Sequence, residues 1–220
     1  MIELIDLHKT HRLRGRATVV ARGITATFPA GRAVALLGRN GAGKSSLLRM
    51  IAGTMDPDRG TIRARGTVSW PVGHAGSFHG ELTGAQNARF IARVYGVDTG
   101  ELCAYVADFA ELGSHFQLPV KSYSSGMRAR LAFGISMGIG FDTYLVDEVT
   151  AVGDAAFREK SERVFMARMG KAGAIVVSHA MPMVRRTCTL GAVLEDGRLT
   201  WHDDIDEAIR HHESAMRQAG

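Results

Sequence analysis

The sequence contains few cysteines, and their placement argues against two kinds of stabilising site. Only two cysteines, Cys103 and Cys188, occur in 220 residues. They lie far apart and outside any CxxC or Cys/His spacing, so we expect neither a structural disulfide nor a zinc site. Both thiols are expected to be buried or chemically idle.

Long apolar runs are also missing. The longest nearly uncharged stretch, Leu131 to Phe141, is too short to cross a bilayer as a helix. The first residues, Met1 to Lys9, have the pattern of a strand and lack the basic, apolar and small-residue order of a signal peptide. We therefore expect a cytosolic chain that touches a membrane only through a partner.

Aromatic residues make up only 7% of the chain. The net charge is +5, and a basic cluster, His8 to Arg16, lies near the N-terminus without interleaved aromatic side chains. This pattern argues against direct binding of nucleic acid. Hydrophobic residues make up 45% of the sequence, which suits a globular domain with a large core.

Alternating strand and helix patterns bracket a helical block in the middle of the chain. We expect strands at Ile2–Leu7, Thr18–Phe28 with a candidate bulge at Gly23, Ala33–Leu37, Tyr144–Val146 and Ala174–Val177. We also expect a hairpin within Val193–Trp201, with its turn at Asp196-Gly197. We expect helices at Ser45–Ala52, Thr83–Tyr95, Glu101–Leu112, Ser124–Gly138 and Asp154–Met169, and a polar helix at the end of the chain. This order predicts an α/β fold with a mostly parallel sheet and an antiparallel N-terminal β piece. The expected helical subdomain, at about residues 83–138, is inserted in one domain spanning 1–220.

The first helix of that block carries two local signals. Thr83 and Gln86 have the spacing of a capping box. Four apolar residues give this helix an apolar stripe: Phe90, Ile91, Val94 and Tyr95.

A glycine-rich segment, Gly38 to Ser45, matches the phosphate-loop pattern GxxxxGK[ST] at every fixed position. An expected buried strand precedes it and a helix follows, so its backbone N–H groups and the helix N-terminus would face a polyphosphate. Lys44 would reach the β- and γ-phosphates, and the Ser45 hydroxyl would bind Mg²⁺. The residues expected to contact the nucleotide here are Gly38, Asn40, Gly41, Ala42, Gly43, Lys44, Ser45 and Ser46. Kinases, GTPases, helicases and transport ATPases all remain open at this point.

Two acids, Asp147 and Glu148, end a second apolar strand. In a phosphate-loop fold, Asp147 would lie beside Mg²⁺ and hold it through water. Glu148 would polarise the attacking water. Taken alone, the same pair could be an acidic turn after a strand.

The segment Tyr123 to Met127 resembles the LSGGQ signature of ABC ATPases and lies about twenty residues before the acidic pair, as in that family. It departs from the signature at three of five positions but keeps Ser124 and Gly126. The resemblance implies that both contact a phosphate from a helix N-terminus. By itself, Ser124 could be a plain N-cap.

Two further segments fit the same family. His179 follows an apolar strand pattern and resembles the switch histidine, which implies that it contacts the γ-phosphate and orients Glu148. Ala151 to Asp154 resembles the D-loop that couples two subunits, which places Asp154 among the residues implied at the nucleotide site. Five motifs thus occur in family order between residues 38 and 179.

Two positions depart from the family pattern. By position, His11 replaces the aromatic ring that stacks on adenine and offers a smaller stacking plane. The family's glutamine that touches Mg²⁺ has no counterpart between Ser69 and Glu81, where His74 is the nearest polar candidate.

Nearly the whole chain resembles the capsular-polysaccharide exporter ATPases of Gram-negative bacteria and, more distantly, those of O-antigen and teichoic-acid exporters. The segments that carry this resemblance are Val68–Gly73, Ser77–Gly84, Tyr123–Met127 and Asp147–Lys160. The resemblance implies an ATPase at the cytoplasmic face of the bacterial inner membrane that powers capsular polysaccharide export through a separate permease. It also implies a head-to-tail homodimer, with ATP and Mg²⁺ held between the phosphate loop of one copy and the signature of the other.

In such a complex, two copies of the permease would pair with the ATPase dimer, and periplasmic and outer-membrane export components would be reached indirectly. The helical block Thr83–Gly138, with the loop Val72–Gly84, would dock the permease. Two alternatives stay open: an exporter of another substrate, such as O-antigen, teichoic acid or lipid, and a non-transport ABC ATPase acting on ribosomes or DNA. Co-purification with a small integral membrane protein would separate the non-transport ATPase from the exporters.

Overall fold

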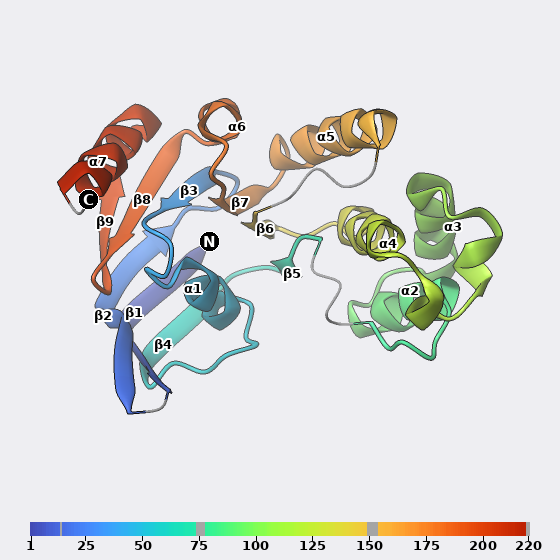
Figure 1. The fold of residues 1–220 in the computed structure, drawn as a ribbon, viewed down its shortest axis with the longest axis horizontal. Helices are drawn as coiled ribbons and strands as arrows, with labels where there is room; N and C mark the ends of the chain where they lie inside the picture. The colour runs from blue at the N-terminus through green and yellow to red at the C-terminus, as the bar shows by residue number, and fades with distance from the viewer. Residues whose placement is uncertain (14, 74–77, 149–153, 219–220) are drawn as a thin grey trace. The chain divides into compact units, whose positions relative to one another are not determined.

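The computed structural model describes residues 1–13, 15–73, 78–148 and 154–218 (Figure 1). The chain divides into two compact units. The sheet unit comprises Met1–Pro71, Phe141–Glu148 and Met169–Gly220. The helical unit comprises Val72–Gly140 and Val149–Arg168. The helical unit is therefore built from two separate segments of the chain, and each of them is inserted between segments of the sheet unit.

A six-stranded sheet is the centre of the sheet unit, with the strand order β5-β6-β7-β3-β8-β9. All neighbours are parallel except the last pair, β8 and β9. The strands are β3 (Ala33–Leu37), β5 (Val68–Pro71), β6 (Thr143–Asp147), β7 (Gly173–Val177), β8 (Leu190–Glu195) and β9 (Arg198–His202). Every residue of β3 and β7 is buried, as expected for short apolar runs covered on both faces. The predicted α/β fold with a mostly parallel sheet is confirmed.

The hairpin of β8 and β9 closes through Asp196 and Gly197. Both residues have positive φ, 44° and 77°, which matches the tight turn that an Asp-Gly pair favours. The predicted Asp196-Gly197 turn is confirmed.

A second, antiparallel sheet has the order β2-β1-β4 and is the predicted N-terminal piece. Its strands are β1 (Ile2–Leu13), β2 (Arg16–Phe28) and β4 (Arg59–Ala64). The register passes from Leu7–Ile24 to His8–Arg22 and skips Gly23, which confirms the predicted bulge. The predicted end of β1 at Leu7 was wrong by six residues, because the polar segment after it pairs with β2 and needs no apolar pattern to do so.

The helices α1 (Lys44–Ile51), α6 (Met181–Thr187) and α7 (Ile205–Gln218) belong to the sheet unit. Helix α1 buries Leu47, Leu48 and Met50 in a core shared with β3 and with the antiparallel sheet. This core holds the end of β3 and the start of α1 in place, and the phosphate-loop motif lies between them.

The helical unit contains α2 (Gly84–Val94), α3 (Thr99–Ala110), α4 (Ser125–Gly138) and most of α5 (Ala155–Met169), with short 3₁₀ turns at Gly113–Gln117 and Val120–Ser122. The capping box predicted for α2 is present: the Thr83 hydroxyl accepts from the Gln86 backbone N–H at 3.1 Å, and the Gln86 side chain accepts from the Thr83 N–H at 2.9 Å. Among the described residues, no helix has both the length and the apolar character needed to span a membrane.

The apolar stripe predicted along α2 is only partly buried. Ile91 is buried, but Phe90 and Val94 are 58% and 60% exposed, and Tyr95 is 38% exposed. The buried face instead contains Ala85, Ala88, Ile91 and Ala92, because small side chains let the helix pack closely. Helical spacing identified an apolar stripe, but of its four residues only Ile91 shares the buried face with the alanines.

We predict that Thr83→Ala destabilises the protein by about 1 kcal/mol, because it removes one half of the capping box. Chemical denaturation monitored by circular dichroism measures this change. Thr99→Ala, at the first position of α3, is the matched control and should change stability by less than about 0.5 kcal/mol. Equal stability of Thr83→Ala and wild type would contradict the capping role.

Candidate functional site

The loop between β3 and α1 has a backbone that only glycine adopts easily. Gly38, Gly41 and Gly43 have φ values of 149°, 82° and 104°. A side chain at Gly38 would collide with the carbonyl oxygen of Leu194, and one at Gly43 would collide with the Val20 side chain. Local backbone geometry and close neighbours therefore both require glycine here.

Lys44 is the only charged side chain among the buried residues that the structure describes, with 8% of the residue exposed. Its ammonium group donates hydrogen bonds to the backbone carbonyls of Gly38 at 2.7 Å and Arg39 at 3.0 Å. Burial lowers the pKa of Lys44, while the nearby carboxylates of Glu148 and Asp147 act in the opposite direction. The lysine thus lies across the loop, where a phosphate group would meet it.

A cavity of about 350 Å³ opens beside this loop within the sheet unit. Its lining gathers most of the nucleotide-contact residues expected from the sequence, together with Thr18, Val20 and Val177, which the sequence analysis missed. The expected residues in the lining are His11, Asn40, Gly41, Gly43, Lys44, Ser45, Ser46 and Glu148. Two further residues expected to contact the nucleotide lie nearby. Gly38 is in the same loop, and Ala42 lines an adjoining cavity of about 490 Å³.

Neighbouring parallel strands bring the proposed catalytic carboxylate and histidine together. Glu148 directly follows β6, and its backbone N–H donates to the carbonyl of Val177 at the end of β7, at 2.9 Å. His179 follows β7 by two residues, and its Nε2 lies 3.0 Å from Glu148 Oε1. Glu148 has a φ of 48°, an uncommon conformation for a non-glycine residue. The contact can orient the carboxylate, as a positioned histidine does for a general base.

Asp147 is the last residue of β6 and pairs in register with Val177. Within the described residues, no cluster of three or more His, Cys, Asp or Glu side chains could hold a metal ion. A Mg²⁺ ion bound through Ser45 and Asp147 fits this donor set, because Mg²⁺ keeps several waters and takes few protein ligands when phosphates supply the rest.

His11 lies on β1 and lines the cavity. Its Nε2 is 2.9 Å from the Ser46 hydroxyl, so the ring is tied to the start of α1. The family resemblance placed His11 at the adenine, but its contact with Ser46 joins residues 35 positions apart and could not be foreseen.

Ser124 and Gly126 lie in the helical unit at the start of α4. The Ser124 hydroxyl accepts from the Met127 N–H at 3.2 Å, so it is the N-cap of this helix. Among the described residues, an added side chain at Gly126 would meet only the Ser124 hydroxyl, 3.9 Å away. In contrast to Gly38 and Gly43, no neighbour in that part of the chain requires glycine at position 126.

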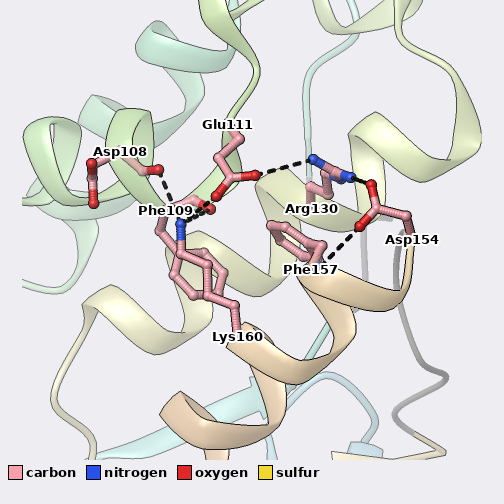
Figure 2. A network of polar contacts seen from close by, with 7 residues as sticks. All are labelled: Asp108, Phe109, Glu111, Arg130, Asp154, Phe157 and Lys160. Atoms are coloured by element: carbon pink, nitrogen blue, oxygen red, sulfur yellow. Dashed lines mark hydrogen bonds and ion pairs between the residues drawn. The ribbon is translucent and has the colours of Figure 1, made fainter.

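The Asp154 carboxylate is engaged inside the helical unit (Figure 2). It accepts from the Phe157 backbone N–H at 2.9 Å and forms an ion pair with Arg130 at 2.9 Å. The bond from Phe157, aided by Arg130, lowers the pKa of Asp154. The rest of the expected D-loop, Ala151 to Gly153, and the candidate His74 lie outside the described residues.

Residues 21–151 match the profile of the ABC transporter family. The chain is 43% identical over 212 residues to the polysialic acid transport ATP-binding protein KpsT of Escherichia coli, with 95% of each chain covered. It is 40% identical to the capsule polysaccharide export ATP-binding protein CtrD of Neisseria meningitidis serogroup B, covering 97% of this chain and 99% of that protein.

A solved ATP-binding cassette, a dimer in a post-hydrolysis state bound to ADP and Pi, has the same fold with a TM-score of 0.75. At 18% identity the match covers 92% of this chain and 98% of that one. The family match covers more than half of the chain, and the two relatives align along almost their full length. The chain therefore belongs to the ABC transporter family of ATP-binding proteins.

Proposed function

We propose that the chain is the ATP-hydrolysing subunit of a capsular-polysaccharide exporter and acts at the cytoplasmic face of the bacterial inner membrane. One observation carries the ATPase assignment: within the sheet unit, the Lys44 loop and Glu148 line one cavity, and His179 pairs with that carboxylate. The relatives KpsT and CtrD support the choice of a capsular glycan as cargo. An ATPase subunit of an exporter for another substrate, such as O-antigen, teichoic acid or lipid, is the alternative.

In the proposed reaction, ATP binds over the loop and the Lys44 ammonium exchanges its carbonyl partners for β- and γ-phosphate oxygens. His11 offers its ring to the adenine. Glu148 polarises the attacking water, and His179 holds that carboxylate and adds a contact to the γ-phosphate. Mg²⁺, held by Ser45 and Asp147, would neutralise charge on the phosphate oxygens.

Two copies are proposed to pair head to tail, so that Ser124 and Gly126 of one copy contact the nucleotide of the other. Two features of α4 support this part. Its N-terminal N–H groups favour an anion. Gly126 leaves open space that the fold itself does not need, which suits the close approach of a ligand. We also place Asp154 at this dimer contact, because its segment resembles the D-loop.

The helical block Thr83–Gly138, with the loop Val72–Gly84, is proposed to dock the membrane permease, two copies of which would accompany the ATPase dimer. Phe90 and Val94 support this assignment, because α2 leaves these large apolar side chains largely exposed. Closure of the dimer around ATP would then push on the permease. Periplasmic and outer-membrane components would be reached only through it.

We expect Lys44→Ala to weaken ATP binding by about 10- to 100-fold, because it removes a charged hydrogen-bond donor from the phosphates. Isothermal titration with ATP measures the Kd. Lys171→Ala, which removes a lysine outside the loop, is the control and should bind like wild type. Unchanged affinity in Lys44→Ala would contradict the phosphate role.

Glu148→Gln should bind ATP and dimerise but hydrolyse it at least about 100-fold more slowly, because the amide cannot accept the proton of the attacking water. Phosphate release and size-exclusion chromatography with ATP measure the two properties. The control, Glu159→Gln on α5, should hydrolyse ATP normally. Wild-type turnover in Glu148→Gln would remove Glu148 as the activating group.

His179→Ala should slow hydrolysis by about 100-fold, as removal of one transition-state interaction does, while ATP binding changes little. Steady-state kinetics separates kcat from KM. His115→Ala, an exposed histidine in the helical unit, provides the comparison. If both variants turned over alike, the 3.0 Å contact between His179 and Glu148 would have only a structural role.

A further inference from the structure

Arg130 of α4 is at the centre of a polar cluster in the helical unit (Figure 2). Its guanidinium group lies between two carboxylates, 2.9 Å from Asp154 Oδ2 and 3.7 Å from Glu111 Oε2. It also covers the Phe157 ring at 4.3 Å from the ring centroid. Only 18% of the Arg130 side chain is exposed, although both of its carboxylate partners are more than half exposed. Its position is therefore fixed on three sides.

The same cluster closes the end of α3. Glu111 has a φ of 52° and is the C-cap of that helix, while Lys160 of α5 approaches its Oε1 to 2.7 Å. The Lys160 ammonium also donates to the last carbonyls of α3, at 3.2 Å to Phe109 and 3.4 Å to Asp108. These bonds satisfy acceptors that a helix end leaves without partners. Three helices, α3, α4 and α5, are thus joined through one group of charges.

The ends of this cluster lie next to two proposed functional segments. Arg130 is six residues after Ser124, on the helix whose N-terminus carries Ser124 and Gly126. Asp154 is six residues after Glu148 and caps the start of α5 through Phe157. The ion pair between Arg130 and Asp154 therefore ties the signature helix to the start of the helix that follows the catalytic acid.

Stability alone is a weak reason for such a pair. An ion pair with an exposed carboxylate adds little to folding, and the Asp154 side chain is 68% exposed. The orientation of α4 is a stronger reason for the pair, because a displacement of about 1 Å that breaks a phosphate interaction can slow an enzyme severely. A guanidinium fixed by two carboxylates and an aromatic ring restricts rotation of α4 more than a single pair would.

We propose that Arg130 is a positioning residue: through Asp154 and Glu111 it fixes the N-terminus of α4 against the start of α5, so that Ser124 and Gly126 meet the nucleotide of the partner copy. This proposal rests on the proposed function, since it concerns the ATP-bound dimer. Arg130 itself contacts no substrate. Its removal should weaken dimer formation and turnover while leaving ATP binding by a single copy unchanged.

Asp154→Asn is the sharpest test, because asparagine still caps a helix but cannot pair with a guanidinium as a charge. Asp98→Asn is its matched control: Asp98 caps α3 by accepting from the Glu101 N–H at 2.8 Å and makes no ion pair among the described residues. Both changes are placed in the Glu148→Gln protein, and ATP-driven dimerisation is measured by sedimentation. We expect Asp154→Asn to weaken dimerisation about threefold or more, and Asp98→Asn to leave it within about twofold.

A double-mutant cycle separates positioning from direct contact of Asp154 with the nucleotide. Arg130→Met alone should weaken dimerisation as Asp154→Asn does, and the double variant should weaken it no further than either. The ATP affinity of the monomer and the melting temperature should stay close to those of the parent. If Arg130→Met does not fold, Arg130→Lys takes its place, since lysine keeps the charge but lacks the planar fork.

Three results would overturn the proposal: additive effects in the double variant, equal effects in Asp98→Asn and Asp154→Asn, or unchanged dimerisation in Asp154→Asn. The parent proteins separate this failure from that of the proposed function. If wild type hydrolyses ATP and Glu148→Gln dimerises with it, unchanged variants refute only the positioning role. If neither parent responds to ATP, both proposals fall.

Discussion

The close packing of β8 and β2 around the loop Gly38–Gly43 is the constraint on which the proposed site depends. β8 lies against one end of the loop and β2 against the other, so that neither Gly38 nor Gly43 has room for a side chain. Because these strands belong to different sheets, the loop is fixed by both sheets of the sheet unit. Fixed backbone dipoles bind phosphate well because little ordering is needed when the ligand arrives.

Strand order then decides which side chains can meet that phosphate. β6 and β7 are parallel neighbours, so the residues that follow them emerge at the same edge of the sheet. Glu148 and His179 come from segments about thirty residues apart, yet they approach to 3.0 Å for this reason. β3 lies beside β7, which brings Lys44 near the carboxylates of Glu148 and Asp147. Burial lowers the pKa of Lys44, and the charges of these two carboxylates act to raise it. The parallel sheet thus brings together the groups that we propose to hydrolyse a phosphate anhydride.

The helical unit contributes in another way, through helix ends and the charges that join them. Its signature segment departs from LSGGQ at three of five positions, but it keeps the two residues that we propose to contact the nucleotide, Ser124 and Gly126. Ser124 caps α4, and Gly126 is small where the fold would accept a larger residue. This contrast with Gly38 and Gly43 separates glycines that the fold needs from one that a ligand would need. The strong similarity to capsule-exporter ATPases is therefore compatible with an altered signature.

The sequence by itself determined the features that depend on neighbours along the chain: the phosphate loop between a buried strand and a helix, the Thr83–Gln86 capping box, the Gly23 bulge and the Asp196-Gly197 turn. Each is written in spacing and local chemistry. It also indicated the fold class and most element bounds, and it brought His179 and Glu148 into one hypothesis. Only tertiary structure decided that Phe90 and Val94 are exposed, that His11 reaches Ser46, and that Arg130 pairs with Asp154. Those outcomes depend on how far each helix is rotated and on contacts between distant segments, which sequence periodicity does not specify.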